Sequence, residues 1–241
     1  MRRVPLHRGQ SEAANAARQT AAIDVIARQP GTARLRKFSF GSNGVPGMQT
    51  AVLFLETDSI VTMPCLSEHG KAVREHQLSD AITVLGANCQ NLVIYLDAGA
   101  ADALSARDAA LYLRKSGVGM IQGVSLDATH FDGTLNEIRY GREISRPLGG
   151  KHFVINTGEN GPGPQRPRDI VHQSVEVLCN PRARLGPLPT ATTGYGNVDT
   201  VAWTSNPGES GGQRVPEAPP IGAHRPAYAT SLVPNADFKV R

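Results

Sequence analysis

The stretch LFLETDSI, residues 53–60, decides the fold that we expect of this chain. An apolar run from Ala51 to Leu55 leads directly into two acidic side chains, Glu56 and Asp58. Buried parallel strands are written as continuous runs of Val, Ile and Leu, and in α/β proteins the chemistry lies where such strands end. The stretch therefore predicts a buried parallel strand whose carboxyl end carries acidic groups.

A second stretch, NLVIYLDAGAADAL at residues 91–104, repeats this arrangement. It is apolar through Leu96 and then presents Asp97. Two acids at strand ends, each followed by a helix-like segment, indicate an acid/base site such as one that cleaves sugars. An aspartate just past a strand can also simply cap the next helix, so each acid has a structural interpretation as well.

The rest of the chain alternates strands with helices, which favours a parallel sheet built from right-handed βαβ units. We expect one α/β domain over residues 1–241, with residues 1–10 as a disordered tail. The predicted helices cover about residues 11–28, 67–85, 104–115, 133–146 and 225–233, and the predicted strands cover residues 34–40, 51–56, 92–97, 120–126, 152–156 and 198–203.

The composition excludes several classes of protein. Apolar residues make up 40% of the chain and charged residues 19%, which is ordinary for a soluble globular protein. The net charge of +4 comes from scattered basic residues rather than from a basic stripe, so we expect no nucleic-acid partner. No apolar run reaches the roughly 18 residues of a membrane span. The start, MRRVPLHRGQ, has no apolar stretch behind it and does not read as a secretory signal.

Cysteine and glycine patterns give no sign of a cofactor or metal. The chain has three cysteines, Cys65, Cys89 and Cys179, so at least one thiol is free. Two alternatives stay open: a disulfide between Cys65 and Cys89, or three reduced cysteines. The sequence contains no CxxC or HxxxH spacing and no P-loop, and its GESGG and GVSLD segments miss the GxSxG spacing of an esterase. We expect neither a metal nor a cofactor.

Five motifs, in order, carry a family resemblance: LETDS, YLDAG, GKHFVINTGENG, LCNP and WTSNPGESGG. Together they resemble glycoside hydrolase family 6, the inverting endoglucanases and cellobiohydrolases that act on β-1,4-glucans, over roughly residues 50–240. The resemblance implies a distorted, incomplete (β/α) barrel, here divergent and shortened at its N-terminal side. It also implies an extracellular monomer that binds a β-glucan or cello-oligosaccharide, whereas the start taken as it stands implies a cytoplasmic protein.

The resemblance also assigns roles to particular residues. Asp58 matches the general acid of the family, and Asp97 matches a second acid of the site that helps to hold the proton on Asp58. The substrate-binding positions implied by the resemblance are Glu56, His130, Asn180, Trp203 and Glu209. Three of these have a structural interpretation as well: His130 can be a surface or core residue, Trp203 can be a core residue, and Asn180 can be a turn residue before Pro181.

The chain departs from the family pattern where the catalytic base is usually found. Gly211 stands in place of the aspartate that is the usual candidate for the base, and Ser205 replaces a lysine before the PGE motif. Ala100 replaces a histidine, and Asp127 stands where asparagine is usual. Asp127 or Asp132 is then a candidate for a substitute base.

Two functions follow from this pattern. The first is inverting hydrolysis of β-1,4-glucosidic bonds in cellulose or related β-glucans, with Asp58 as the acid. The second is a catalytically impaired relative that keeps Asp97, Asn180 and Glu209 as sugar ligands and holds glucan chains without efficient turnover. An unrelated α/β enzyme such as an esterase is the third and weakest interpretation, because no nucleophile elbow is present.

Overall fold

The computed structural model describes residues 51–88, 92–161, 183–210, 219–220, 222–234 and 236–237. The tail at 1–10, the predicted helix at 11–28 and the predicted strand at 34–40 lie outside these residues.

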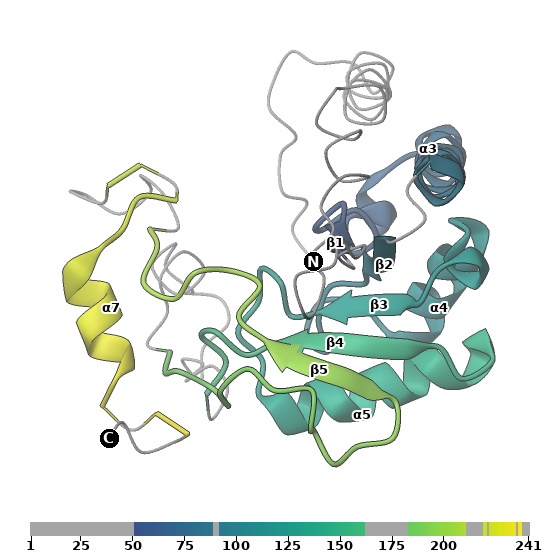
Figure 1. Ribbon diagram of the computed structural model, residues 1–241. Helices are drawn as coiled ribbons and strands as arrows, with labels where there is room; N and C mark the ends of the chain where they lie inside the picture. The colour runs from purple at the N-terminus through teal and green to yellow at the C-terminus, as the bar shows by residue number, and fades with distance from the viewer. Residues whose placement is uncertain are drawn as a thin grey trace, which may run out of the picture. The chain divides into compact units, whose positions relative to one another are not determined.

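The described part of the chain is an α/β structure with one five-stranded sheet, in the order β1-β2-β3-β4-β5 (Figure 1). β1 pairs with β2 in parallel, and β4 pairs with β5 in parallel. The described strands form no closed barrel, which agrees with the predicted incomplete (β/α) barrel. The strands are β1 (Ala51–Leu55), β2 (Leu92–Asp97), β3 (Gly123–Leu126), β4 (His152–Asn156) and β5 (Val198–Ala202).

The helices alternate with these strands as the sequence predicts. Ser67 caps the first of them, because its Oγ accepts a hydrogen bond of 3.1 Å from the N–H of Gly70. Four α-helices and three short 3-10 helices are described: α3 (Glu68–Asn88), α4 (Ala106–Lys115), α5 (Thr134–Ser145), α7 (Pro226–Leu232), η1 (Met63–Cys65), η2 (Val118–Met120) and η3 (Arg146–Leu148).

The predicted strand at 120–126 is wrong at its start. Residues 118–120 form the 3-10 turn η2, which follows Gly117 in the left-handed conformation (φ 88°), and β3 begins only at Gly123. Met120 is 59% exposed. A short apolar run does not by itself separate a strand from a tight turn that packs on one side.

The chain divides into two compact units, and the first comprises the described residues up to 98 together with 108–124. Within it, α3 packs against β2. The contact face of α3 is apolar, because Leu78, Ile82 and Leu85 are all buried, as are Ile94 and Leu96 of the strand. This core supports the end of β2, where Asp97 lies.

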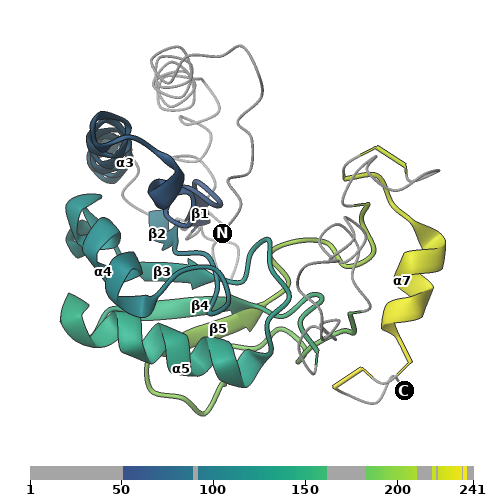
Figure 2. The same ribbon diagram turned by 180° about the vertical axis from the view of Figure 1, so that it is seen from behind.

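The second unit comprises residues 99–107 and the described residues from 125 onward. Here α5 packs against β4, and Figures 1 and 2 both show the helix running alongside that strand. Gly141 allows the close approach, since a Cβ at this position would overlap the ring of the fully buried Phe153. The packing brings α5 close to the amino half of β4.

Candidate active site

The loop after β1 holds two candidate residues in a strained backbone. Glu56 and Asp58 both have positive φ, 50° and 63°. Non-glycine residues in this region cost about 1–3 kcal/mol each and gather at active sites. The N–H of Asp58 donates a hydrogen bond of 3.1 Å to Oδ1 of Asp97, which is almost fully buried. The structure thus brings the two predicted acids together, through the backbone of one and the carboxylate of the other.

Arg74 of α3 holds the same loop from the other side. Its Nη1 donates to the carbonyl oxygen of Ser59 (3.1 Å) and to Oγ1 of Thr62 (2.7 Å), and Thr62 in turn donates to the carbonyl oxygen of Asp58 (2.7 Å). Burial lowers the pKa of Arg74, while the charge of Glu56 opposes that shift. Arg74 is absent from the predicted site, because a basic residue within an amphipathic helix gives no sign of facing inward.

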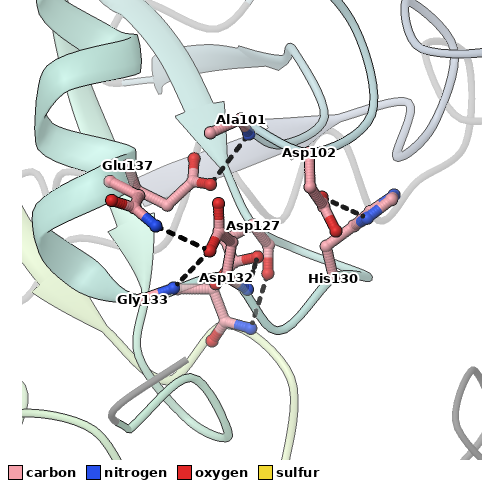
Figure 3. A network of polar contacts seen from close by, with 9 residues as sticks. Ala101, Asp102, Asp127, His130, Asp132, Gly133 and Glu137 are labelled. Carbon is pink, nitrogen blue, oxygen red and sulfur yellow. Dashed lines mark hydrogen bonds and ion pairs between the residues drawn. The ribbon is translucent and has the colours of Figure 1, made fainter. Parts of the chain in front are cut away.

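Asp127 lies at the end of β3 and is fully buried, again with a positive φ, 64° (Figure 3). Its N–H donates to the carbonyl oxygen of Gly99 (2.8 Å), and its Oδ1 accepts a hydrogen bond of 3.1 Å from the N–H of Asp132. Burial raises the pKa of Asp127 well above its ordinary range, and the charge of Glu137 raises it further. We therefore assign Asp127 a structural role, since its buried carboxyl group accepts a backbone hydrogen bond and is not exposed to an attacking water molecule.

Asp132 is committed to the start of α5. Its Oδ1 accepts hydrogen bonds from the N–H of Gly133 (2.9 Å) and from Nδ2 of Asn136 (3.0 Å). The neighbouring Glu137 is fully buried, and its Oε1 accepts a hydrogen bond of 2.8 Å from the N–H of Ala101 (Figure 3). These contacts favour helix initiation over the substitute-base role for Asp132.

His130, a predicted substrate-binding residue, lies on the loop after β3 and pairs with Asp102. Its Nδ1 is 3.0 Å from Oδ1 of Asp102, and the two side chains are 30% and 23% exposed (Figure 3). Asp102, on the loop after β2, was missed because a lone aspartate in a turn carries no sequence signal. The structure places His130 on the loop after β3, and its sugar contact stays a prediction.

Asn156, the last residue of β4, connects three loops. Its Nδ2 donates to the carbonyl oxygen of Asp127 and to Oγ of Ser205, both at 3.0 Å. Its Oδ1 accepts from the N–H groups of Gly158 (3.2 Å) and Thr204 (3.0 Å). The amide thereby uses its full hydrogen-bonding capacity. The sequence does carry a signal for Asn156, because this residue ends the apolar run HFVIN in the same way that Asp97 ends LVIYLD.

The loop that carries Glu209 is held by Glu159. Oε1 of Glu159 accepts a hydrogen bond from the N–H of Gly208 (2.7 Å), and Oε2 accepts one from the hydroxyl of Tyr228 in α7 (2.9 Å). Burial raises the pKa of Glu159, and the charge of Glu209 adds to that effect. Glu209 also accepts a hydrogen bond from Asn206, so its carboxylate is held within the turn.

Of the remaining residues named from the sequence, Trp203 makes a core contact, Cys65 is exposed, and the others lie outside the described residues. The indole N–H of Trp203 donates to the carbonyl oxygen of Pro187 (3.3 Å), and the side chain packs against a cluster that includes Leu185 and Tyr228. The core interpretation therefore accounts for Trp203, whose role as a wall of the sugar site stays a prediction. Cys65 is a free, exposed cysteine. Asn180, Gly211, Cys89 and Cys179 lie outside the described residues.

The described residues set two limits on the site. No cluster of three or more His, Cys, Asp or Glu side chains suited to a metal ion occurs among them. Nor does any helix in this part of the chain have the length and apolar character needed to cross a membrane.

Two curated relatives resemble the chain in sequence. Endoglucanase A of Cellulomonas fimi is 32% identical over 173 residues, which are 71% of this chain and 35% of that protein. Endoglucanase 1 of Streptomyces halstedii is 29% identical over 167 residues, which are 67% of this chain and 48% of that protein. The chain therefore spans less than half the length of either relative.

Solved structures with the same fold include an endoglucanase Cel6 from Mycobacterium tuberculosis in complex with methyl-cellobiosyl-4-deoxy-4-thio-β-D-cellobioside. It superimposes with a TM-score of 0.76 at 30% identity, over 91% of this chain and 68% of that one. An enzyme from Orpinomyces sp. Y102 gives a TM-score of 0.72 at 22% identity, over 97% of this chain and 74% of that one. The family model for glycosyl hydrolases family 6 matches residues 46–236. The chain belongs to glycosyl hydrolases family 6.

Proposed function

We propose that the protein hydrolyses β-1,4-glucosidic bonds of cellulose or a related β-glucan with inversion, and that Asp58 is the general acid. Family membership and the two endoglucanase relatives support this proposal. The observation that carries it is the strained turn after β1, where Asp58 has positive φ and donates its N–H to the buried carboxylate of Asp97.

Inverting hydrolysis is a single displacement at the anomeric carbon. A carboxyl group donates its proton to the leaving glycosidic oxygen while a water molecule attacks from the opposite face of the sugar. Asp58 supplies that proton. Asp97 fixes the backbone beneath it, and Thr62 and Arg74 prevent the turn from relaxing.

The substrate-binding residues of the proposal follow several strands: Glu56 follows β1, His130 follows β3, and Trp203 and Glu209 follow β5. Glu56, His130, Trp203 and Glu209 contact the sugar units, and Asn180 completes the set. A polymeric glucan does not enter cells, so we place the activity outside the cell. The reaction requires neither a cofactor nor a metal.

A second function is favoured by one observation, the serine at position 205. Ser205 accepts a hydrogen bond from Asn156 where the family pattern has a lysine. Together with Gly211 in place of the usual aspartate, this change favours a relative that binds glucan chains through Asp97, Asn180 and Glu209 with little turnover.

The test compares wild type with Asp58→Asn on carboxymethyl-cellulose and barley β-glucan. The amide keeps the shape of the carboxyl group but donates no acidic proton, so turnover falls by about 10²–10⁴. Binding of cellotetraose, measured by calorimetry, is retained. The matched control is Asp80→Asn on the exposed side of α3, which leaves the rate unchanged.

The stereochemistry of the product gives an independent reading. Proton NMR of the early reaction shows the α-anomer first if the β-bond is cleaved by a single displacement. An initial β-anomer contradicts inversion. A wild type that binds cello-oligosaccharides without turnover supports the binding protein instead, and a wild type that does neither excludes both functions.

A further inference from the structure

Glu159 connects the loop after β4 to two later segments of the second unit. Its Oε1 accepts a hydrogen bond from the N–H of Gly208 (2.7 Å), and its Oε2 accepts one from the hydroxyl of Tyr228 in α7 (2.9 Å). Gly208 directly precedes Glu209, a predicted sugar contact. All four residues belong to the second unit. One carboxyl group therefore connects the turn at 206–209 to α7.

Gly208 packs directly against α7. Its φ is 90°, and a Cβ at this position would overlap Ala229 of the helix. Its carbonyl oxygen accepts a hydrogen bond of 2.8 Å from the N–H of Arg225, the residue before the helix. Together with the hydrogen bond to Glu159, these contacts fix the N–H, the Cα and the carbonyl oxygen of Gly208.

The side chain of Glu209 extends from this fixed backbone and is partly exposed. Nδ2 of Asn206 donates a hydrogen bond to its Oε1, and the backbone of Glu209 forms an antiparallel bridge with that of His224. A side chain that binds a ligand must be held within about 0.5 Å of its productive position. A shift of Gly208 would displace the neighbouring Cα from which the Glu209 carboxylate reaches a sugar.

Hydrogen bonds, rather than attraction between charges, hold Glu159 against the turn. Burial raises the pKa of Glu159, the hydrogen bonds from Gly208 and Tyr228 lower it, and the charge of Glu209 raises it. Of the described residues, Glu209 is thus the charged group that acts on Glu159, and it repels an ionised Glu159. A neutral side chain that keeps both hydrogen bonds should therefore replace Glu159.

We propose that Glu159 and Tyr228 are positioning residues that fix, through Gly208, the place at which Glu209 contacts the sugar. The inference rests on the sugar-contact role of Glu209 in the proposed function. It holds for an efficient hydrolase and for a glucan-binding relative alike, because both bind the chain through Glu209. Its main readout is therefore the affinity for a glucan rather than turnover.

The test measures affinity for methyl-cellobiosyl-4-deoxy-4-thio-β-D-cellobioside by calorimetry, since the thio linkage of this ligand resists hydrolysis. Glu159→Ala removes both hydrogen bonds and raises Kd by about 2- to 10-fold. Glu159→Gln keeps Kd within about twofold of wild type, because the amide oxygen accepts from Gly208 and the amide nitrogen donates to the hydroxyl oxygen of Tyr228. The matched control, Tyr140→Phe, removes the hydroxyl of another buried tyrosine of this unit, on α5, and leaves Kd unchanged.

A double-mutant cycle with Glu209→Ala separates positioning from a purely structural role. If Glu159 acts through Glu209, Glu159→Ala causes no further loss of affinity in the Glu209→Ala background. A role in stability alone lowers the affinity by the same factor in both backgrounds. In hydrolysis of barley β-glucan, Glu159→Ala raises KM while kcat changes little, since the contact is lost from the ground state and the transition state alike.

The outcomes distinguish this inference from the proposed function. A folded Glu159→Ala variant with the Kd of wild type overturns the positioning role, and so do additive losses in the cycle or equal losses in Glu159→Ala and Glu159→Gln. A wild type that shows the expected shifts in Kd but does not hydrolyse β-glucan supports the positioning role and overturns the hydrolysis alone. A wild type that does not bind the thio-linked ligand overturns both. If Glu159→Ala fails to fold, Tyr228→Phe takes its place in the cycle.

Discussion

The described residues of the second unit include two His–Asp pairs, one at the amino end of β4 and one on the loops after β2 and β3, and their surroundings differ. His152 begins β4 and its Nδ1 lies 2.6 Å from Oδ1 of Asp199 in β5, on strands with regular geometry. His130 and Asp102 lie instead on loops at the carboxyl ends of strands. Asn156, the last residue of β4, is 3% exposed and joins three of the loops at that end.

The polar groups at the amino end of β4 are more exposed. Asn197 donates a hydrogen bond of 3.0 Å to Oγ of Ser145, and the guanidinium of Arg142 stands 5.5 Å from the centre of the exposed Tyr195 ring. At the carboxyl end, burial raises the pKa of both Asp127 and Glu159. Burying polar groups costs stability unless each is paired. Asp127 and Glu159 carry that cost at the carboxyl end, where the loops must be held in place and to which we assign catalysis.

The largest effect that we expect from this difference is that of Asn156→Asp. The new carboxylate has no N–H groups to donate to Asp127 and Ser205, and it faces a carbonyl oxygen in a buried position. The free energy of unfolding in urea falls by about 1–3 kcal/mol, and turnover falls with it. The matched change at the other end, Asn197→Asp, costs less than about 0.5 kcal/mol. Equal losses at the two ends contradict the difference between them.

The variant Asp127→Asn tests, through the pH dependence of stability, whether the carboxyl group of Asp127 is buried at a cost. The folded-state pKa of Asp127 is raised, so its contribution to stability is complete at low pH and is lost as the pH rises through that value. The asparagine does not ionise, so its contribution does not change with pH. The melting temperature of the variant, relative to that of wild type, therefore increases from about pH 4 upward. The exposed control Asp80→Asn gives a difference that is flat with pH, and a flat difference for Asp127→Asn refutes the raised pKa.

Much of the fold was predictable because burial leaves a direct signature in sequence. The continuous apolar runs that lead to Glu56 and Asp97 predicted β1 and β2, and the same pattern predicted β4. Residues 120–122 were misassigned to a strand, since a short apolar run is also compatible with a packed turn. The fold class and the family therefore follow from the order of these runs and motifs along the chain.

The site was predictable only where a side chain follows a strand directly. Asp58 and Asp97 were found in this way. Asn156 and Glu159 were missed, although both lie at or just beyond the end of β4, because their partners Ser205 and Gly208 are 49 residues further along the chain. Hydrogen bonds that join distant loops leave no periodic pattern, so a single sequence does not predict them.

The smallest expected effect belongs to the pair at the amino end of β4. The side chains of His152 and Asp199 are 43% and 26% exposed, so water screens their attraction. A double-mutant cycle of His152→Ala and Asp199→Ala gives a coupling of about 0.2–1 kcal/mol in the free energy of unfolding, and turnover on β-glucan stays within about twofold of wild type. The corresponding cycle at His130 and Asp102 lowers turnover as well, because His130 is a proposed sugar contact and Asp102 holds its ring. If the two cycles give the same effects on stability and on turnover, the pairs are equivalent, and the functional difference between them is refuted.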